Sequence, residues 1–232
     1  MKRFWRTVTA SAVDGGWQVA LDDRPIRTPG KVALVLPNAA MAEAMAAEWA
    51  AVGDTVDPTA MPVTRAANTA IDRVVPHYAL VVDEVAGFGE TDLLCYRAPA
   101  PEGLVARQRK AWDPLLDWAA ESYGARLTAS AGVMFAAQDA AAIAALRAAV
   151  GAHGPWRLTA LHELVTISGS LVLGLAVSAG RLEAEACWRL SRIDEDWNIE
   201  EWGADDEAAA VAQKREAALL GAARILSMLE VA

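Results

Sequence analysis

The densest group of chemically active side chains lies between residues 194 and 207, which we call the acidic block. It holds eight acidic residues and no basic one: Asp194, Glu195, Asp196, Glu200, Glu201, Asp205, Asp206 and Glu207. Trp197 and Trp202 lie among them. Like charges at this density repel one another unless solvent or a partner of opposite charge stabilises them. The acidic block is therefore the first candidate for a functional site.

Three interpretations suit the acidic block. It could be a solvated polar face, a set of paired carboxylates for acid–base or metal chemistry, or a docking surface bracketed by Trp197 and Trp202. Helical spacing predicts a core-facing stripe made of Leu182, Ala186, Leu190, Ile193 and Trp197. Asp194, Asn198 and Glu201 then fall on a different, outward face. The acids are predicted to be presented to solvent.

Part of the acidic block also suits a structural role. Asp205, Asp206 and Glu207 fit the first turn of the last predicted helix, where negative charge meets the positive end of the helix dipole. We therefore expect some of these acids to stabilise the start of that helix.

Other reactive motifs are incomplete. The glycines at 87 and 89 lack the third glycine of a dinucleotide-binding loop, and no phosphate-binding Gly-Lys-Ser or Gly-Lys-Thr occurs. His162 and Glu163 begin like a zinc-protease helix, but Thr166 occupies the position of the second histidine. No serine lies in a Gly-x-Ser-x-Gly turn. None of these motifs is complete, so none of them predicts a catalytic residue, a metal site, a cofactor or a small-molecule substrate.

Charge and hydropathy argue against some classes of partner and against insertion into a membrane. Acidic residues outnumber basic ones by 30 to 21, and the resulting net charge of −9 opposes binding to nucleic acid. The longest uncharged apolar stretch, residues 164–179, is shorter than the roughly 20 residues that cross a bilayer, so membrane insertion is not expected. Residues 1–6 lead into no signal-peptide core. Cys95 and Cys187 lack zinc-ligand neighbours. These features favour a cytosolic protein with reduced thiols.

The first 75 residues are predicted to form an α+β domain. Residues 5–36 alternate like three or four short antiparallel strands, with Asp14, Gly15 and Gly16 at the first turn and a further strand at 32–36. Asn38 is suited to cap a helix that ends at Gly53, and Thr64 is suited to cap a second helix that stops before Pro76. These helices would cover the sheet.

Residues 76–232 are predicted to form an all-helical domain. The sequence contains 52 alanines, and alanine has the highest helix propensity. Six helical patterns are expected at residues 78–88, 104–123, 139–150, 156–179, 182–201 and 206–229. The predicted fold class is thus α+β, with a small N-terminal sheet followed by a helical bundle.

Several blocks in one order give the chain a family resemblance. The markers are residues 2–5 (KRFW), 21–29 (LDDRPIRTP), 48–49 (EW), 61–65 (MPVTR), 68–72 (NTAID), 90–97 (ETDLLCYR), Gln108, and 112–119 (WDPLLDWA). The acidic block looks like the C-terminal signature that goes with them, an acidic pair, an aromatic residue and then Trp-Gly followed by acids. The chain resembles the ATP synthase assembly chaperones that act on the α subunit of the soluble catalytic head in mitochondria and α-proteobacteria.

The resemblance implies a chaperone and not an enzyme. It would hold the newly made α subunit of the ATP synthase soluble until the β subunit replaces it at the same interface. Eukaryotic relatives would act in the mitochondrial matrix. The residues expected to bind the partner are Glu195, Trp202, Glu200, Glu201, Asp205, Asp206 and Glu207. The alternative is a carboxylate- or metal-dependent enzyme with its site in a cleft between the two domains.

Overall fold

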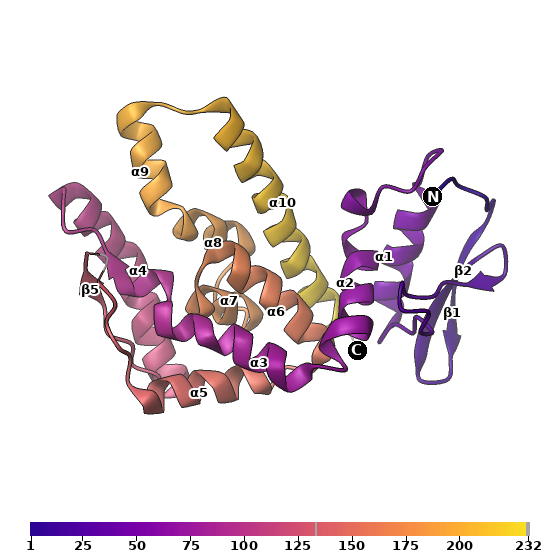
Figure 1. Ribbon diagram of the computed structural model, residues 1–232, viewed down its shortest axis with the longest axis horizontal. Helices are drawn as coiled ribbons and strands as arrows, with labels where there is room; N and C mark the ends of the chain where they lie inside the picture. The colour runs from indigo at the N-terminus through magenta and orange to yellow at the C-terminus, as the bar shows by residue number, and fades with distance from the viewer. Residues whose placement is uncertain (133, 231–232) are drawn as a thin grey trace. The chain divides into compact units, whose positions relative to one another are not determined.

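The computed structural model describes residues 1–132 and 134–230, and its elements are shown in Figure 1. The chain divides into two compact units. The first combines Met1–Tyr78 and Gly154–Ala160 with the segment that starts at Arg224, and the second combines Ala79–His153 with Leu161–Ala223. We predicted from the sequence that one domain spans residues 1–75 and another spans residues 76–232. Whether these two parts fold as independent domains stays a prediction.

The first unit contains a three-stranded antiparallel sheet in the order β1-β2-β3. Strand β1 (Val8–Val13) pairs with β2 (Gly16–Leu21), which pairs with β3 (Arg24–Pro25). Gly15 lies in the turn of the first hairpin with φ 81°, a conformation that glycine adopts without strain. The predicted sheet is confirmed.

The segment 32–36, predicted as a further strand, forms only isolated bridges. Ala33 bridges to Arg27, and Leu36 bridges to Trp17 with backbone bonds of 2.9 and 2.7 Å. Strand β3 pairs with Ala20 and Leu21 at one end of this edge of β2, and Leu36 pairs with Trp17 at the other end. The prediction of a regular strand here was wrong.

Helix α1 (Ala39–Ala50) begins as predicted, because the Asn38 side chain accepts a hydrogen bond from the Met41 amide at 3.0 Å. The Asn38 amide group also donates to the carbonyl of Met228 at 2.8 Å. Residues 190 positions apart therefore meet inside the first unit.

Helix α2 (Pro62–Thr69) begins earlier than predicted and continues into a π-helical turn, Ala70–Val74. Thr64 is not its cap, because it lies within the first helical turn. The Glu48 carboxylate accepts hydrogen bonds from the amides of Val63 and Thr64 at 2.6 and 2.9 Å, and from the Thr64 hydroxyl at 2.7 Å. An acid from α1 thus satisfies the free amides at the start of α2. A short 3₁₀ turn, Pro58–Ala60, precedes it.

Trp49 joins α1 to the N-terminal segment. Its ring is 7% exposed and lies edge-on to Trp5 at 5.2 Å, and the Trp5 indole donates to the Trp49 carbonyl at 3.3 Å. We expect Trp49→Ala to lower the free energy of unfolding by about 3–5 kcal/mol, since a large buried ring leaves a cavity. Urea unfolding measures this effect. Glu43→Ala, exposed on the same helix, is the control, and an equal loss in both variants would contradict the prediction.

The second unit is mainly helical. Its helices are α3 (Tyr78–Gly87, whose first residue belongs to the first unit), α4 (Glu102–Tyr123), α5 (Ala140–Gly151), α7 (Leu171–Ser178), α8 (Ala184–Ser191) and α9 (Ile193–Trp202). Helices α6 (Pro155–Ser168) and α10 (Asp206–Met228) contribute residues to both units. Two 3₁₀ turns, Phe88–Thr91 and Leu93–Cys95, follow α3. The predicted fold class is confirmed, and a parallel pair of two-residue strands, β4 (Tyr96–Arg97) and β5 (Ser130–Ala131), is added to the helices.

Two predicted helices are each broken into two. Gly169, with φ 72°, separates α6 from α7, and Ser170 caps α7 by accepting a hydrogen bond from the Leu173 amide at 3.0 Å. Arg192, with φ −118°, separates α8 from α9. Among the described residues, no helix is long and apolar enough to cross a membrane.

Candidate functional site

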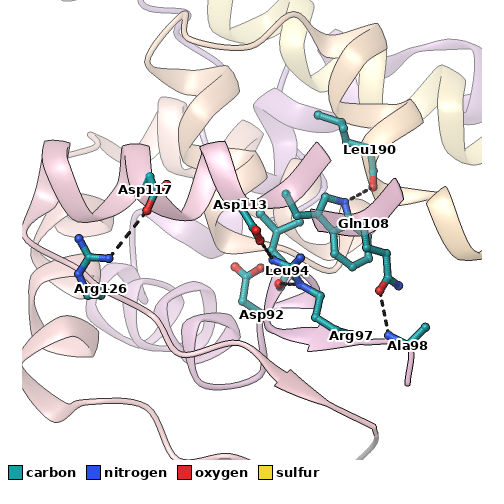
Figure 2. Close-up of polar contacts among 10 residues, drawn as sticks. Asp92, Leu94, Arg97, Ala98, Gln108, Asp113, Asp117, Arg126 and Leu190 are labelled. Carbon is teal, nitrogen blue, oxygen red and sulfur yellow. Dashed lines mark hydrogen bonds and ion pairs between the residues drawn. The ribbon is translucent and has the colours of Figure 1, made fainter. Parts of the chain in front are cut away.

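The base of the candidate site is helix α4, which a buried tryptophan anchors in the second unit. Trp112 is fully buried, and its indole nitrogen donates to the Leu190 carbonyl at the end of α8 at 2.9 Å. The Arg97 guanidinium donates to the Leu94 carbonyl and forms an ion pair with Asp113, both at 2.8 Å (Figure 2). The guanidinium also lies 5.2 Å from the Trp112 ring. These contacts fix α4.

Gln108 links this base to the acidic block. It is fully buried, and its side-chain oxygen accepts from the Ala98 amide at 2.8 Å (Figure 2). Its side-chain nitrogen donates to the Asp194 carboxylate at 2.6 Å. Asp194 is therefore half-buried and bound internally, so the prediction that it faces outward was wrong. The start of α9 is held against α4.

Three other acids of the block also have partners within the chain. The Glu200 carboxylate binds the Arg107 guanidinium through both oxygens at 2.8 and 2.7 Å, and hydrogen bonds from Arg107 lower the pKa of Glu200. Asp196 lies 3.4 Å from Arg192. Asp205 accepts from the amide of Ala208 at 2.7 Å and so caps α10, which confirms that part of the block has a structural role.

The four remaining acids are Glu195, Glu201, Asp206 and Glu207, which are all exposed. Within residues 1–132 and 134–230 none of them has a hydrogen-bond or ion-pair partner in the structure. Their carboxylates are therefore open to solvent and to a partner.

An apolar surface accompanies these acids. Trp202 is 86% exposed, and Ile199 on α9 and Val211 on α10 are 41% and 52% exposed. Glu195, Ile199 and Trp202 are spaced four and then three residues apart, which places them on one face of α9. We call these three residues the α9 face. Large apolar side chains at this exposure, beside free charges, are typical of a binding surface.

The sequence predicted Glu195 and Trp202 as binding residues, and the structure places both on the α9 face. Ile199, Arg107 and the contact role of Gln108 were not predicted. The spacing of Ile199 between Glu195 and Trp202 could have revealed its face. No local signal could have revealed Arg107, because its partner lies 93 residues further along the chain.

The structure places no metal centre among the described residues, since no three His, Cys, Asp or Glu side chains gather there. Cys95 and Cys187 are free and buried, and burial raises the pKa of each thiol to about 12. Both thiols therefore stay protonated at neutral pH.

A hollow of about 450 Å³ lies in the second unit, and no acidic residue lines it. Its walls are mainly alanines of α5, Ala145, Ala148 and Ala149, together with Leu175 of α7. This hollow does not offer the paired carboxylates of the alternative enzyme.

The chain is similar to known proteins in sequence and in structure. Residues 2–120 match the family model of the ATP12 chaperone protein. The mitochondrial protein atp12 of Schizosaccharomyces pombe is 22% identical over 240 residues, which cover 97% of this chain and 82% of that protein. The crystal structure of Atp12 from Paracoccus denitrificans is 49% identical, covers 98% of this chain and 97% of its own, and superposes with a TM-score of 0.94.

An aspartate-to-lysine mutant of the P. denitrificans protein matches to the same extent. The family match spans more than half of the chain, and the solved relatives span nearly all of it. The chain therefore belongs to the ATP12 chaperone family, which acts in ATP synthase assembly.

Proposed function

We propose that this chain binds the unassembled α subunit of the F-type ATP synthase and keeps it soluble until the β subunit replaces it. The observation that carries the proposal is the α9 face, where Trp202 is 86% exposed beside acids that have no partner in the described chain. A surface of this kind in a chain of the ATP12 family suits the capture of a protein partner.

The physical need for such a chaperone follows from assembly. A subunit made for a hetero-oligomer exposes an apolar interface until its neighbour arrives, and exposed apolar patches aggregate. A chaperone that binds this interface reversibly lowers the concentration of subunits with an exposed apolar patch. No ATP is needed for release if the β subunit binds more tightly.

The proposed partner-binding residues have two kinds of role. Glu195 and Trp202 make the main contacts, and Glu201, Asp206 and Glu207 attract basic residues of the partner. Glu200 and Asp205 belong to the same surface, and each also has an internal contact, with Arg107 and with the start of α10 respectively. The capture is expected to weaken as salt rises, because exposed charges are screened.

The proposed place of action is the bacterial cytoplasm. The support is the 49% identity to a protein of the bacterium P. denitrificans, whereas the S. pombe relative is named as mitochondrial. No enzymatic activity belongs to this proposal, since the family is one of chaperones.

Co-expression tests the proposed function. The chain is produced with the α subunit of the ATP synthase from the same cell, and separately with the β subunit, and soluble yield and co-elution are scored. We expect the α subunit alone to be rescued and to co-elute with the chain. Rescue of neither subunit, or of the β subunit alone, would contradict the proposal.

A metal titration separates the proposal from the alternative enzyme. The melting temperature is measured with and without magnesium, calcium or zinc. The chaperone is expected to melt at the same temperature in each case, because ligand binding stabilises only a protein with a site for that ligand. A large metal-dependent rise would favour carboxylate or metal chemistry.

A further inference from the structure

Arg107 of α4 lies at the centre of the contacts that hold helix α9. Its guanidinium forms the two-oxygen ion pair with Glu200 and also lies 4.8 Å from the centre of the Trp197 ring. Gly103, one turn earlier on α4, leaves room for this ring, since a Cβ atom there would lie 2.8 Å from Trp197 Cη2. Arg107 thus contacts α9 at two successive turns.

Helix α9 has little else to hold its far end. It is ten residues long, shorter than the roughly 12–15 residues at which isolated helices become even marginally stable. Its single buried residue is Ile193, at its start, and residues 198–202 are all exposed. The order of the second half of α9 therefore depends on contacts from outside the helix.

The charges of α9 increase this dependence. Five of its ten residues are acidic and none is basic. Glu200 and Glu201 lie in its last turn, where the helix dipole disfavours negative charge. At Glu200 the positive guanidinium of Arg107 offsets both the repulsion among the acids and the unfavourable interaction with the helix dipole.

We propose that Arg107 is a positioning residue that orders the second half of α9 and so presents the α9 face to the partner. The inference rests on the proposed function, because the α9 face is the surface proposed to capture the α subunit. An ordered face loses less conformational entropy on binding than a fraying one. Arg107 does not contact the partner in this account, and it acts through Trp197 and Glu200.

The first test is made on the free protein. Hydrogen exchange of the amides of residues 196–202 is compared between the wild type and Arg107→Ala. We expect exchange in this segment to become about tenfold faster, as the loss of an exposed ion pair and a cation–π contact implies. Arg109→Ala is the matched control, because Arg109 is exposed on the same helix and has no partner in the described chain. Unchanged exchange in Arg107→Ala would overturn the proposal.

The second test measures capture of the purified α subunit. Arg107→Ala is expected to weaken capture by about tenfold, mainly through faster dissociation, whereas Arg109→Ala keeps wild-type affinity. Arg107→Glu should weaken capture further, and adding Glu200→Arg should slow the hydrogen exchange of residues 196–202 again, because the reversed pair reforms the ion pair at unchanged net charge. Faster exchange without weaker capture, or no slowing of exchange by the reversed pair, would overturn the proposal.

The two tests separate the inference from the function on which it rests. If the wild type fails to capture the α subunit, the proposed function fails. The exchange experiment still decides whether Arg107 orders α9, since it needs no partner.

Discussion

Replacing Trp202 by alanine is expected to weaken capture of the ATP synthase α subunit by at least about 30-fold, or about 2 kcal/mol, while the melting temperature stays at its wild-type value. The side chain is 86% exposed in the free protein, so its removal leaves no cavity. On binding, the same ring can bury a large apolar area that carries a hydrogen-bond donor, which is why tryptophan is frequent among residues that dominate interfaces.

The measurement for Trp202→Ala is a binding titration with the purified α subunit, together with a thermal melt. Leu80→Ala is the control, since Leu80 is 68% exposed on α3, outside the acidic block. We expect this control to bind as the wild type does. Equal binding by Trp202→Ala and wild type would remove Trp202 from the proposed surface. A lower melting temperature would instead assign the ring a structural role.

Replacing Glu195 by lysine is expected to have a second large effect, again a loss of capture of about 30-fold or more. Glu195 is exposed, and no residue in the described chain binds its carboxylate. The substitution places a positive charge where basic residues of the partner are proposed to lie, and like charges across an interface repel. The rate of association should fall most, and the difference from wild type should shrink as salt is added.

Two controls separate the effect of Glu195→Lys on binding from its effect on folding. Glu195 lies in the first turn of α9, where a negative charge is favourable, so the lysine is expected to cost about 0.3–1 kcal/mol of helix stability. Glu195→Gln removes the charge without reversing it and should show a smaller loss of capture. Glu121→Lys makes the same charge reversal at an exposed position of α4. A collapsed melt for Glu195→Lys would identify a structural acid.

Periodicity and capping residues predicted most helices of this chain. Asn38 caps α1 as predicted, and the helix predicted to end at Tyr123 does end there, where Gly124 adopts φ 69°. The breaks within predicted helices were missed. Around Gly169 neither a proline nor a charged residue marks the break, and Asp92 accepts a hydrogen bond from the Val172 amide at 3.0 Å. A contact across 80 residues helps to start the new helix, and no local pattern reports it.

The candidate site shows the same division between local and distant information. The composition of the acidic block and the exposure of Glu195 and Trp202 follow from local sequence. Local sequence does not show which of its acids are bound within the chain and which are free. Gln108 and Arg107 bind acids that lie 86 and 93 positions further along the chain. Similarly, Glu48 replaces the predicted cap Thr64 at the start of α2. Side chains that satisfy distant helices are determined only when the fold is complete.

The hydrogen bond from Asn38 to Met228 has a consequence for synthesis on the ribosome. The unit that holds the N-terminal sheet is closed by residues from 154–160 and from position 224 onward, and it also contains the ion pair of Arg157 with Glu230 at 3.4 Å. N-terminal elements usually fold as they emerge during translation. Here the unit that holds the sheet and α1 gains its contacts with Met228 and Glu230 only after those residues have been made, and Met228 lies 190 residues after Asn38. A premature stop in α10 would therefore leave the first unit without part of its packing.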